Sequence, residues 1–123
     1  MKTIFCVIAM VFAASVHADM NVLDYLKAKG SDATGPNSPI LVFVSGTGFA
    51  LLTENNILEP LKRQPLFCVP LSKTLDGNDF MRLLDHGVQR ISATMTANAV
   101  NQTPVSAVIL LELMKTYPCT KTP

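Results

Sequence analysis

The stretch VSAVILLELMKTYPC, residues 105–119, decides the fold. It is apolar nearly all round, and Glu112 and Lys115 are its charged exceptions. A helix that is apolar on every side belongs at the centre of the packing of a globular protein. Pro118 predicts the end of this helix and places Cys119 directly after it.

A second helix is expected upstream, where Thr74 is the predicted opening residue and Asp76 and Asp79 suit the positive N-terminus. Apolar residues recur there in steps of three and four, which is the pattern of a helix with one buried face. The apolar face consists of Leu75, Phe80, Leu83, Leu84, Val88, Ile91 and Met95. The residues expected to face water are Arg82, Asp85, Gln89 and Arg90.

Two more helices are expected nearer the N-terminus. NVLDYLKAK, residues 21–29, has an apolar face and is followed by Gly30, a residue typical of helix C-termini. That face consists of Val22, Leu23, Tyr25 and Leu26. After the polar loop at 31–38, Ser38 can cap a helix that has Pro39 in its first turn.

The helix after Ser38 is predicted to run through ILVFVSGTGFALLTEN, residues 40–55, as a core helix. Its first part, Ile40–Val44, could instead be a buried strand, because valine and phenylalanine favour strands. Gly46 and Ala50 lie one turn apart, so another helix could approach closely on that side.

The three prolines in ILEPLKRQPLFCVP, residues 57–70, predict an irregular connection between the helix at 40–55 and the helix that Thr74 opens. The length of 123 residues suits one domain, and no repeat or linker divides it. The sequence therefore predicts an all-α, small single-domain helical bundle of about four helices.

The first eighteen residues, MKTIFCVIAMVFAASVHA, predict a cleaved export signal. Lys2 precedes an apolar run from Ile4 to Ala14, and the stretch closes on residues that signal peptidase accepts, ending at Ala18. The run is shorter than the roughly 20 apolar residues that span a bilayer. Cleavage would leave residues 19–123 as the mature domain, and a short N-terminal anchor is the alternative.

Removal of the leader would make the chain formally neutral, because ten Lys and Arg less Lys2 leaves nine, against nine Asp and Glu. A neutral chain has no net positive electrostatic potential to attract nucleic acid or anionic lipid, so we expect neither as a partner. Cys6 would leave with the leader, and Cys68 and Cys119 would remain. In an exported protein this pair predicts a disulfide, worth roughly 4 kcal/mol on the loop-entropy model. Two free buried thiols are the alternative.

No catalytic or metal-binding pattern is evident in the mature sequence. His86 is its one histidine, and no serine or cysteine lies in a hydrolase motif, so we expect His86 at the surface or at the boundary of the core. Cys68 and Cys119 match no zinc spacing, and residues 46–48 (Gly-Thr-Gly) lack the rest of a dinucleotide fingerprint. We therefore expect no metal, no cofactor and no enzymatic activity.

The surroundings of the two cysteines carry a family resemblance. LFCVP at 66–70 is followed by a threonine-capped helix and by a terminal apolar helix that closes on YPC at 117–119. FVSGTGFALL at 43–52 looks like a glycine-containing helix upstream. In this order the motifs resemble the Rap/Tai family of type VI secretion amidase immunity proteins, over residues 40–123.

The resemblance implies a small helical protein of the bacterial periplasm with a disulfide between its two motif cysteines. Such proteins bind a peptidoglycan amidase toxin, a cysteine–histidine enzyme injected by neighbouring cells, and block its active site. They catalyse nothing themselves, and homodimers occur among them. The residues carried over are all structural: Gly46, Phe67, Cys68, Pro118 and Cys119.

The sequence departs from the family at TANAVNQTP, residues 96–104, where a short loop containing His-Pro is expected. A stiff, exposed loop with hydrogen-bonding side chains would suit an enzyme cleft. The candidate partner-binding residues are therefore Asn98, Asn101 and Gln102. An ordinary helix connection is the alternative, and the proline-rich stretch with Glu59, Lys62 and Arg63 is a rival patch.

Three functions follow from these features. The first is a periplasmic immunity protein whose partner is a cognate peptidoglycan amidase effector, with no membrane contact after signal cleavage. The second is a periplasmic structural or chaperone-like helical protein with many clients. The third is a small hydrolase centred on His86.

Overall fold

The structure, a computed structural model, describes residues 19–31 and 38–120, and within them the chain forms five α-helices. These are α2 (Val22–Ser31), α3 (Pro39–Leu58), α4 (Gly77–Ser92), α5 (Ala97–Gln102) and α6 (Val105–Thr116). The part of the chain described here contains no strand, so the all-α prediction is confirmed, with one helix more than expected. The predicted leader at 1–18 and residues 32–37 of the polar loop lie outside the described residues.

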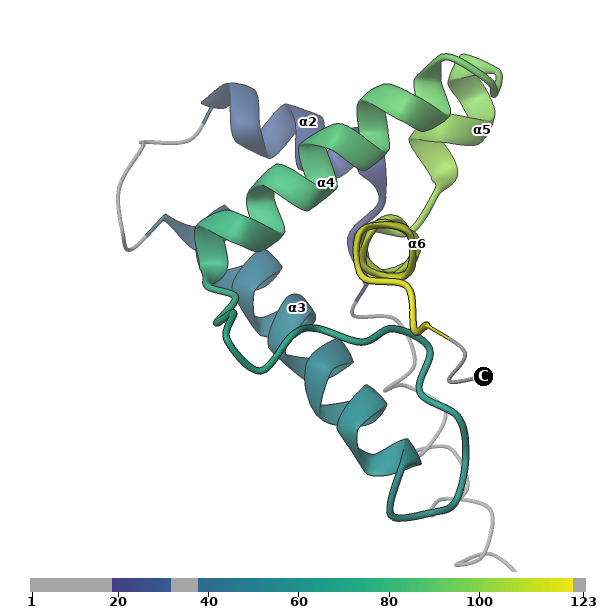
Figure 1. Ribbon diagram of the computed structural model, residues 1–123. Helices are drawn as coiled ribbons and strands as arrows, with labels where there is room; N and C mark the ends of the chain where they lie inside the picture. The colour runs from purple at the N-terminus through teal and green to yellow at the C-terminus, as the bar shows by residue number, and fades with distance from the viewer. Residues whose placement is uncertain (1–18, 32–37, 121–123) are drawn as a thin grey trace, which may run out of the picture.

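The helices pack around α4 and α6, which cross near the middle of the molecule (Figure 1). α3 packs against α4 and extends away from the crossing, while α2 and α5 lie together at the opposite end (Figure 1). Half of the buried apolar side chains of the described residues come from α4 and α6. They are Phe80, Leu84, Val88, Val105, Val108, Ile109 and Leu113.

The central position of α6 is confirmed, but its buried side differs from the expectation. Leu111 is 51% exposed, whereas Glu112 is only 6% exposed and its carboxylate pairs with Arg90 of α4. Gly87 is the reason, because a Cβ there would lie 2.4 Å from a methyl carbon of Val108 and 2.8 Å from the Cγ of Glu112. The glycine lets α6 approach α4 so closely that the stem of Glu112 is buried and its carboxylate reaches Arg90.

The predicted start of α3 is confirmed, since Ser38 caps it and its hydroxyl accepts a hydrogen bond from the backbone N–H of Leu41. Residues 40–44 are helical, so the strand alternative is wrong. α3 is also not a core helix, because Val42 is 61% exposed and Phe49 48% exposed. Among the described helices α3 alone is long and apolar enough to cross a membrane, a test that rests on length and composition only.

The close approach predicted at Gly46 and Ala50 is wrong. No heavy atom lies within 4 Å of the place a Cβ would take at Gly46, whereas at Gly48 it would lie 2.3 Å from the ring of Phe80. The buried residues of α3, which are Ile40, Val44, Gly48 and Asn55, occupy the side of the helix opposite Gly46. The glycine that permits helix packing is therefore Gly48.

Two predicted helix ends also differ. α4 begins at Gly77 rather than Thr74, because Asp76 caps it and forms a reciprocal capping box with Asp79. The backbone hydrogen bond from Asp76, with help from Arg82, lowers the pKa of Asp79. α2 continues past Gly30 to Ser31, since Gly30 does not adopt the left-handed conformation that would stop the helix.

α2 docks onto α4 through Asp85, which was expected only to face water. The hydroxyl of Tyr25 donates a hydrogen bond to Asp85 at 2.7 Å, and Lys29 pairs with the same carboxylate at 2.6 Å. Burial and the neighbouring carboxylate raise the pKa of Tyr25. Just upstream, the backbone N–H of Val22 donates to the carbonyl oxygen of Thr103 at 2.9 Å, which ties the start of α2 to the α5–α6 junction.

Candidate functional site

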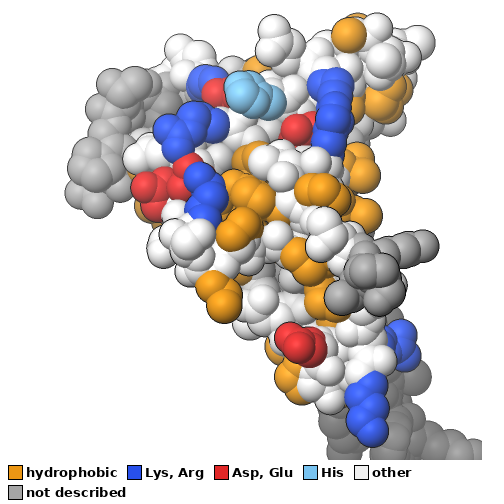
Figure 2. Space-filling model, viewed as in Figure 1, with side chains coloured by type: hydrophobic (Ala, Val, Ile, Leu, Met, Phe, Trp, Pro, Cys, Tyr) orange, Lys and Arg blue, Asp and Glu red, His pale blue; other side chains and the backbone are white. Residues whose placement is uncertain are grey.

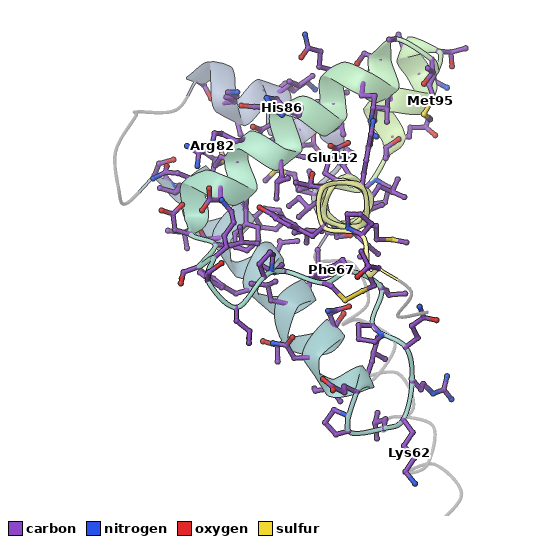
Figure 3. The ribbon with its side chains drawn as sticks, in the orientation of Figure 1. Lys62, Phe67, Arg82, His86, Met95 and Glu112 are labelled. Carbon is purple, nitrogen blue, oxygen red and sulfur yellow. A yellow bond between two sulfur atoms is a disulfide. The ribbon has the colours of Figure 1, made fainter. Side chains whose placement is uncertain are left out.

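The chain projects from the helical body where α3 ends. We call residues 57–66 the tip. In Figure 3 Lys62 lies at the end of the tip, far from the crossing of α4 and α6. The projection arises because α3 is long and its last turns extend beyond the helices it packs against (Figure 1). The irregular connection predicted from its prolines is confirmed from residue 59 onward, since residues 57 and 58 belong to α3.

The tip turns through a Schellman motif, the hydrogen-bond pattern that closes many helices. Arg63 donates its backbone N–H to the carbonyl oxygen of Leu58 at 2.8 Å, and Lys62 donates to that of Glu59 at 2.8 Å. Lys62 has φ 56° and, within the described residues, is the one non-glycine residue with positive φ. Glycine is the usual residue at this left-handed position, because a Cβ is strained there.

The return arm of the tip is fixed to α3 by Asn55, which is buried near the end of that helix. The side-chain amide donates to the carbonyl oxygen of Phe67 at 2.9 Å. Its oxygen accepts from the backbone N–H of Leu66 at 2.8 Å and of Phe67 at 3.3 Å. Phe67 itself is a fully buried core residue, so the arm is held by both its side chain and its backbone.

The predicted disulfide, which holds the same arm, is confirmed. The sulfur atoms of Cys68 and Cys119 lie 2.00 Å apart across a sequence separation of 51. The backbone N–H of Cys68 also donates to the carbonyl oxygen of Tyr117 at 2.7 Å. Figure 3 shows the bond beside Phe67, just below the end of α6. The tip is therefore braced against α3 and against the segment that follows α6, and neither sulfur is a free thiol.

The tip presents apolar and cationic side chains together. Leu61 is 62% exposed, and Lys62 and Arg63 beside it are exposed too. Figure 2 shows the basic side chains at the narrow end of the molecule, with an acidic one nearer the body. The rival patch of Glu59, Lys62 and Arg63 is thus brought together in space, and Leu61, which the sequence did not single out, joins it.

An open groove of about 480 Å³ lies between the second half of α3 and residues 65–75, next to the tip. Its lining includes Phe49, Leu52, Asn56 and Leu71. Leu71 is fully exposed, so the groove has an apolar wall that continues onto the surface. A wall of this kind adds apolar contact area to any partner that covers the tip.

The predicted binding loop at 96–104 is wrong as a loop, because its residues form α5. The hydroxyl of Thr96 caps this short helix, and the buried side chain of Val100 anchors it. The side chains of Asn98 and Gln102 bond to each other at 3.2 Å, and both are exposed, whereas Asn101 is half-buried. Two of the three candidate residues are therefore close together, but they lie flat on a helix rather than on a projecting loop.

His86 is exposed on α4 and lies on the upper side in Figure 3, so its predicted surface position is confirmed. Over residues 19–31 and 38–120, no group of three or more histidine, cysteine or acidic side chains is placed to hold a metal ion. The sequence missed Asn55, since nothing in a pattern distinguishes a buried asparagine from an exposed one.

Over the described residues, the fold and the tip define a small all-α protein with the Cys68–Cys119 disulfide and a braced projection. Comparison of the chain with models of protein families, with curated proteins and with solved structures finds no match.

Proposed function

We propose that the mature chain is a periplasmic immunity protein that binds a type VI secretion peptidoglycan amidase and occludes its active site. The observation that carries the proposal is the braced tip, which is held by Asn55 of α3 and by the Cys68–Cys119 disulfide to the segment that follows α6. The likeness of LFCVP and YPC to the Rap/Tai motifs and the predicted export signal support it. The protein inhibits by occupying the active site of the amidase and performs no reaction itself.

A braced projection suits inhibition for an energetic reason. A flexible loop loses conformational freedom on binding, and this loss subtracts from the affinity. Residues 66–68 are fixed by hydrogen bonds to Asn55 and Tyr117 before any partner arrives. The tip can therefore enter a cleft at a low entropic cost and exclude the substrate from it.

The test is a titration of the purified, oxidised protein with the purified amidase encoded by the neighbouring gene. Isothermal calorimetry should give a stoichiometric complex, and cleavage of peptidoglycan stem peptides should stop at the same ratio. Deletion of the gene should make cells sensitive to attack by siblings. The proposal fails if no toxin encoded beside the gene forms a complex and the deletion strain keeps its protection.

The apolar surface of α3 favours a second candidate, a chaperone-like periplasmic protein. Val42, Phe49 and Ile57 are each about half exposed or more, and exposed apolar patches often mark interaction sites. Such a protein would bind many clients rather than one. Affinity purification from periplasmic extract separates the two candidates, because one stoichiometric partner supports immunity and a spread of clients supports the chaperone.

Export and self-association belong to the same proposal. Intact-mass measurement of the native protein should place its N-terminus at Asp19, which would establish cleavage after Ala18. A retained leader would contradict the periplasmic part of the proposal.

Sedimentation of the purified protein decides between a monomer and a homodimer, for which the exposed side of α3 with Gly46 is the obvious contact face.

A further inference from the structure

We propose that Leu61, Lys62 and Arg63, at the apex of the tip, form the docking surface for a protein cleft with an apolar floor and an acidic rim. The amidase is named as the owner of that cleft only because the inference rests on the proposed function. The position and chemistry of the apex come from the structure itself.

The first reason is the backbone of Lys62. Its φ of 56° lies in the left-handed region, where a glycine would close the Schellman motif without strain. Backbone strain at a surface turn lowers stability, and it can be retained where the side chain contributes to function. Residues with strained backbones cluster at functional sites. The lysine side chain is exposed and points away from the body in Figure 3.

The second reason is the placement of the supports. Asn55, Cys68 and the buried ring of Phe67 hold both sides of the base of the tip. None of the three lies at the apex, and together they leave Leu61 and the two cations projecting from a rigid base. A surface that is rigid and prominent can insert into a concave partner, whereas the amides of Asn98 and Gln102 bond to each other along the short helix α5.

The third reason is the combination of side chains. Leu61 is 62% exposed and offers an apolar anchor, and the guanidinium of Arg63 can bind a carboxylate through two parallel hydrogen bonds. Charge complementarity then requires acidic groups around the pocket that receives Leu61. Glu59 lies in the same turn, and with two cations against one carboxylate the apex keeps a net positive charge. A protein cleft fits better than a membrane, since only two cations are present.

The experiment compares two charge reversals of equal size by calorimetry against the amidase encoded beside the gene. The apex variant is Lys62→Glu with Arg63→Glu, and the control is Lys27→Glu with Lys115→Glu, two exposed lysines on α2 and α6. The apex variant should bind about 30-fold or more weakly, while the control should change by less than about 3-fold. Leu61→Ser should weaken binding about 10-fold or more, and Leu26→Ser on α2 should not.

Circular dichroism and thermal unfolding of each variant show whether it is folded. We expect every variant to fold, because all the exchanged side chains are exposed. Equal effects of the apex and control reversals would overturn the inference and leave the immunity proposal standing. If no amidase binds wild-type protein, the immunity proposal fails. The docking surface is then tested in living cells, where benzoylphenylalanine at position 61 forms a photo-cross-link to any protein that contacts the apex. An adduct abolished by the apex reversal would support the docking surface on another protein.

An adduct that survives the apex reversal, or an equal yield from a cross-linker at position 26, would overturn the inference. Vesicles containing one quarter phosphatidylglycerol, mixed with wild-type protein at physiological salt, test the membrane alternative. Binding to these vesicles that the apex reversal abolishes would also overturn it, because the apex would then be a lipid contact.

Discussion

The side-chain amide of Asn55 lies 2.9 Å from the carbonyl oxygen of Phe67, a residue twelve positions further along the chain. The amide oxygen accepts two backbone N–H groups of the same arm, so one buried side chain satisfies three backbone groups. Because a buried backbone group without a partner costs about 1–3 kcal/mol, Asn55→Ala should lower the free energy of unfolding by roughly 2 kcal/mol or more. Urea denaturation measures this change.

The neighbouring Asn56 is an exposed control on the same helix. Asn56→Ala should change the free energy of unfolding by less than about 0.5 kcal/mol. If the two variants unfold at the same urea concentration, Asn55 does not hold the arm, which then depends on the disulfide, the burial of Phe67 and the backbone hydrogen bond to Tyr117.

Two glycines of α3 should respond to alanine in opposite directions. A Cβ at Gly48 would overlap the fully buried ring of Phe80 at 2.3 Å, so Gly48→Ala should destabilise the fold by about 1–3 kcal/mol. Gly46 has open space, and alanine there should stabilise the helix by about 0.5–1 kcal/mol. Thermal unfolding of the two single variants tests this. A Gly46→Ala variant as unstable as Gly48→Ala would mean that a partner or second copy covers Gly46.

This contrast illustrates what the sequence could and could not predict. The helices, the cap at Ser38 and the Cys68–Cys119 bond follow from local signals, namely periodicity, capping residues and cysteine number. The glycine that permits close packing is decided by the side of α3 that faces α4. The sequence of α3 is apolar on more than one side, so it does not specify which side is buried. The same ambiguity hid the burial of Glu112.

The candidate binding residues show a similar limit. TANAVNQ is polar enough for a loop, yet Thr96 caps it and Val100 anchors it, so it folds as α5. The patch at Glu59, Lys62 and Arg63 was evident from its prolines and charges. Its projection was not, because that depends on how far α3 extends beyond the helices it packs against.

Lys62→Gly should separate stability from binding. Glycine relieves the left-handed backbone strain, so the free energy of unfolding should rise by about 0.5–1 kcal/mol, while the affinity for the amidase should fall with the loss of the cation. Chemical denaturation and calorimetry on one preparation give both quantities. A variant with unchanged or lower stability would show that the lysine conformation carries no strain.

Tyr25 makes the stability depend on pH in the alkaline range. Its pKa in the folded protein is raised above the ordinary value of 10.0, first by burial and then by the hydrogen bond to Asp85. The unfolded chain therefore releases this proton at lower pH than the folded one, so the stabilisation is complete below pH 10 and is lost as the pH rises above it. Urea midpoints measured from pH 8 to pH 11 should fall above pH 10, and Tyr25→Phe should remove that part of the fall. Identical slopes in both proteins would exclude Tyr25 as the cause.

The disulfide should contribute a large share of the stability. Replacement of both cysteines, Cys68→Ser with Cys119→Ser, should lower the free energy of unfolding by about 2–4 kcal/mol, because the bond closes a long loop. Non-reducing mass spectrometry after alkylation should find no free thiol in native protein. Two alkylated cysteines in that material would contradict the covalent brace.

Hydrogen–deuterium exchange of the protein, free and saturated with the amidase, tests most directly whether the tip meets the partner. Exchange should slow on binding in peptides that cover residues 57–68 and stay unchanged in those that cover α5, residues 97–102. Slowing confined to residues 97–102, or no slowing anywhere, would contradict docking through the tip.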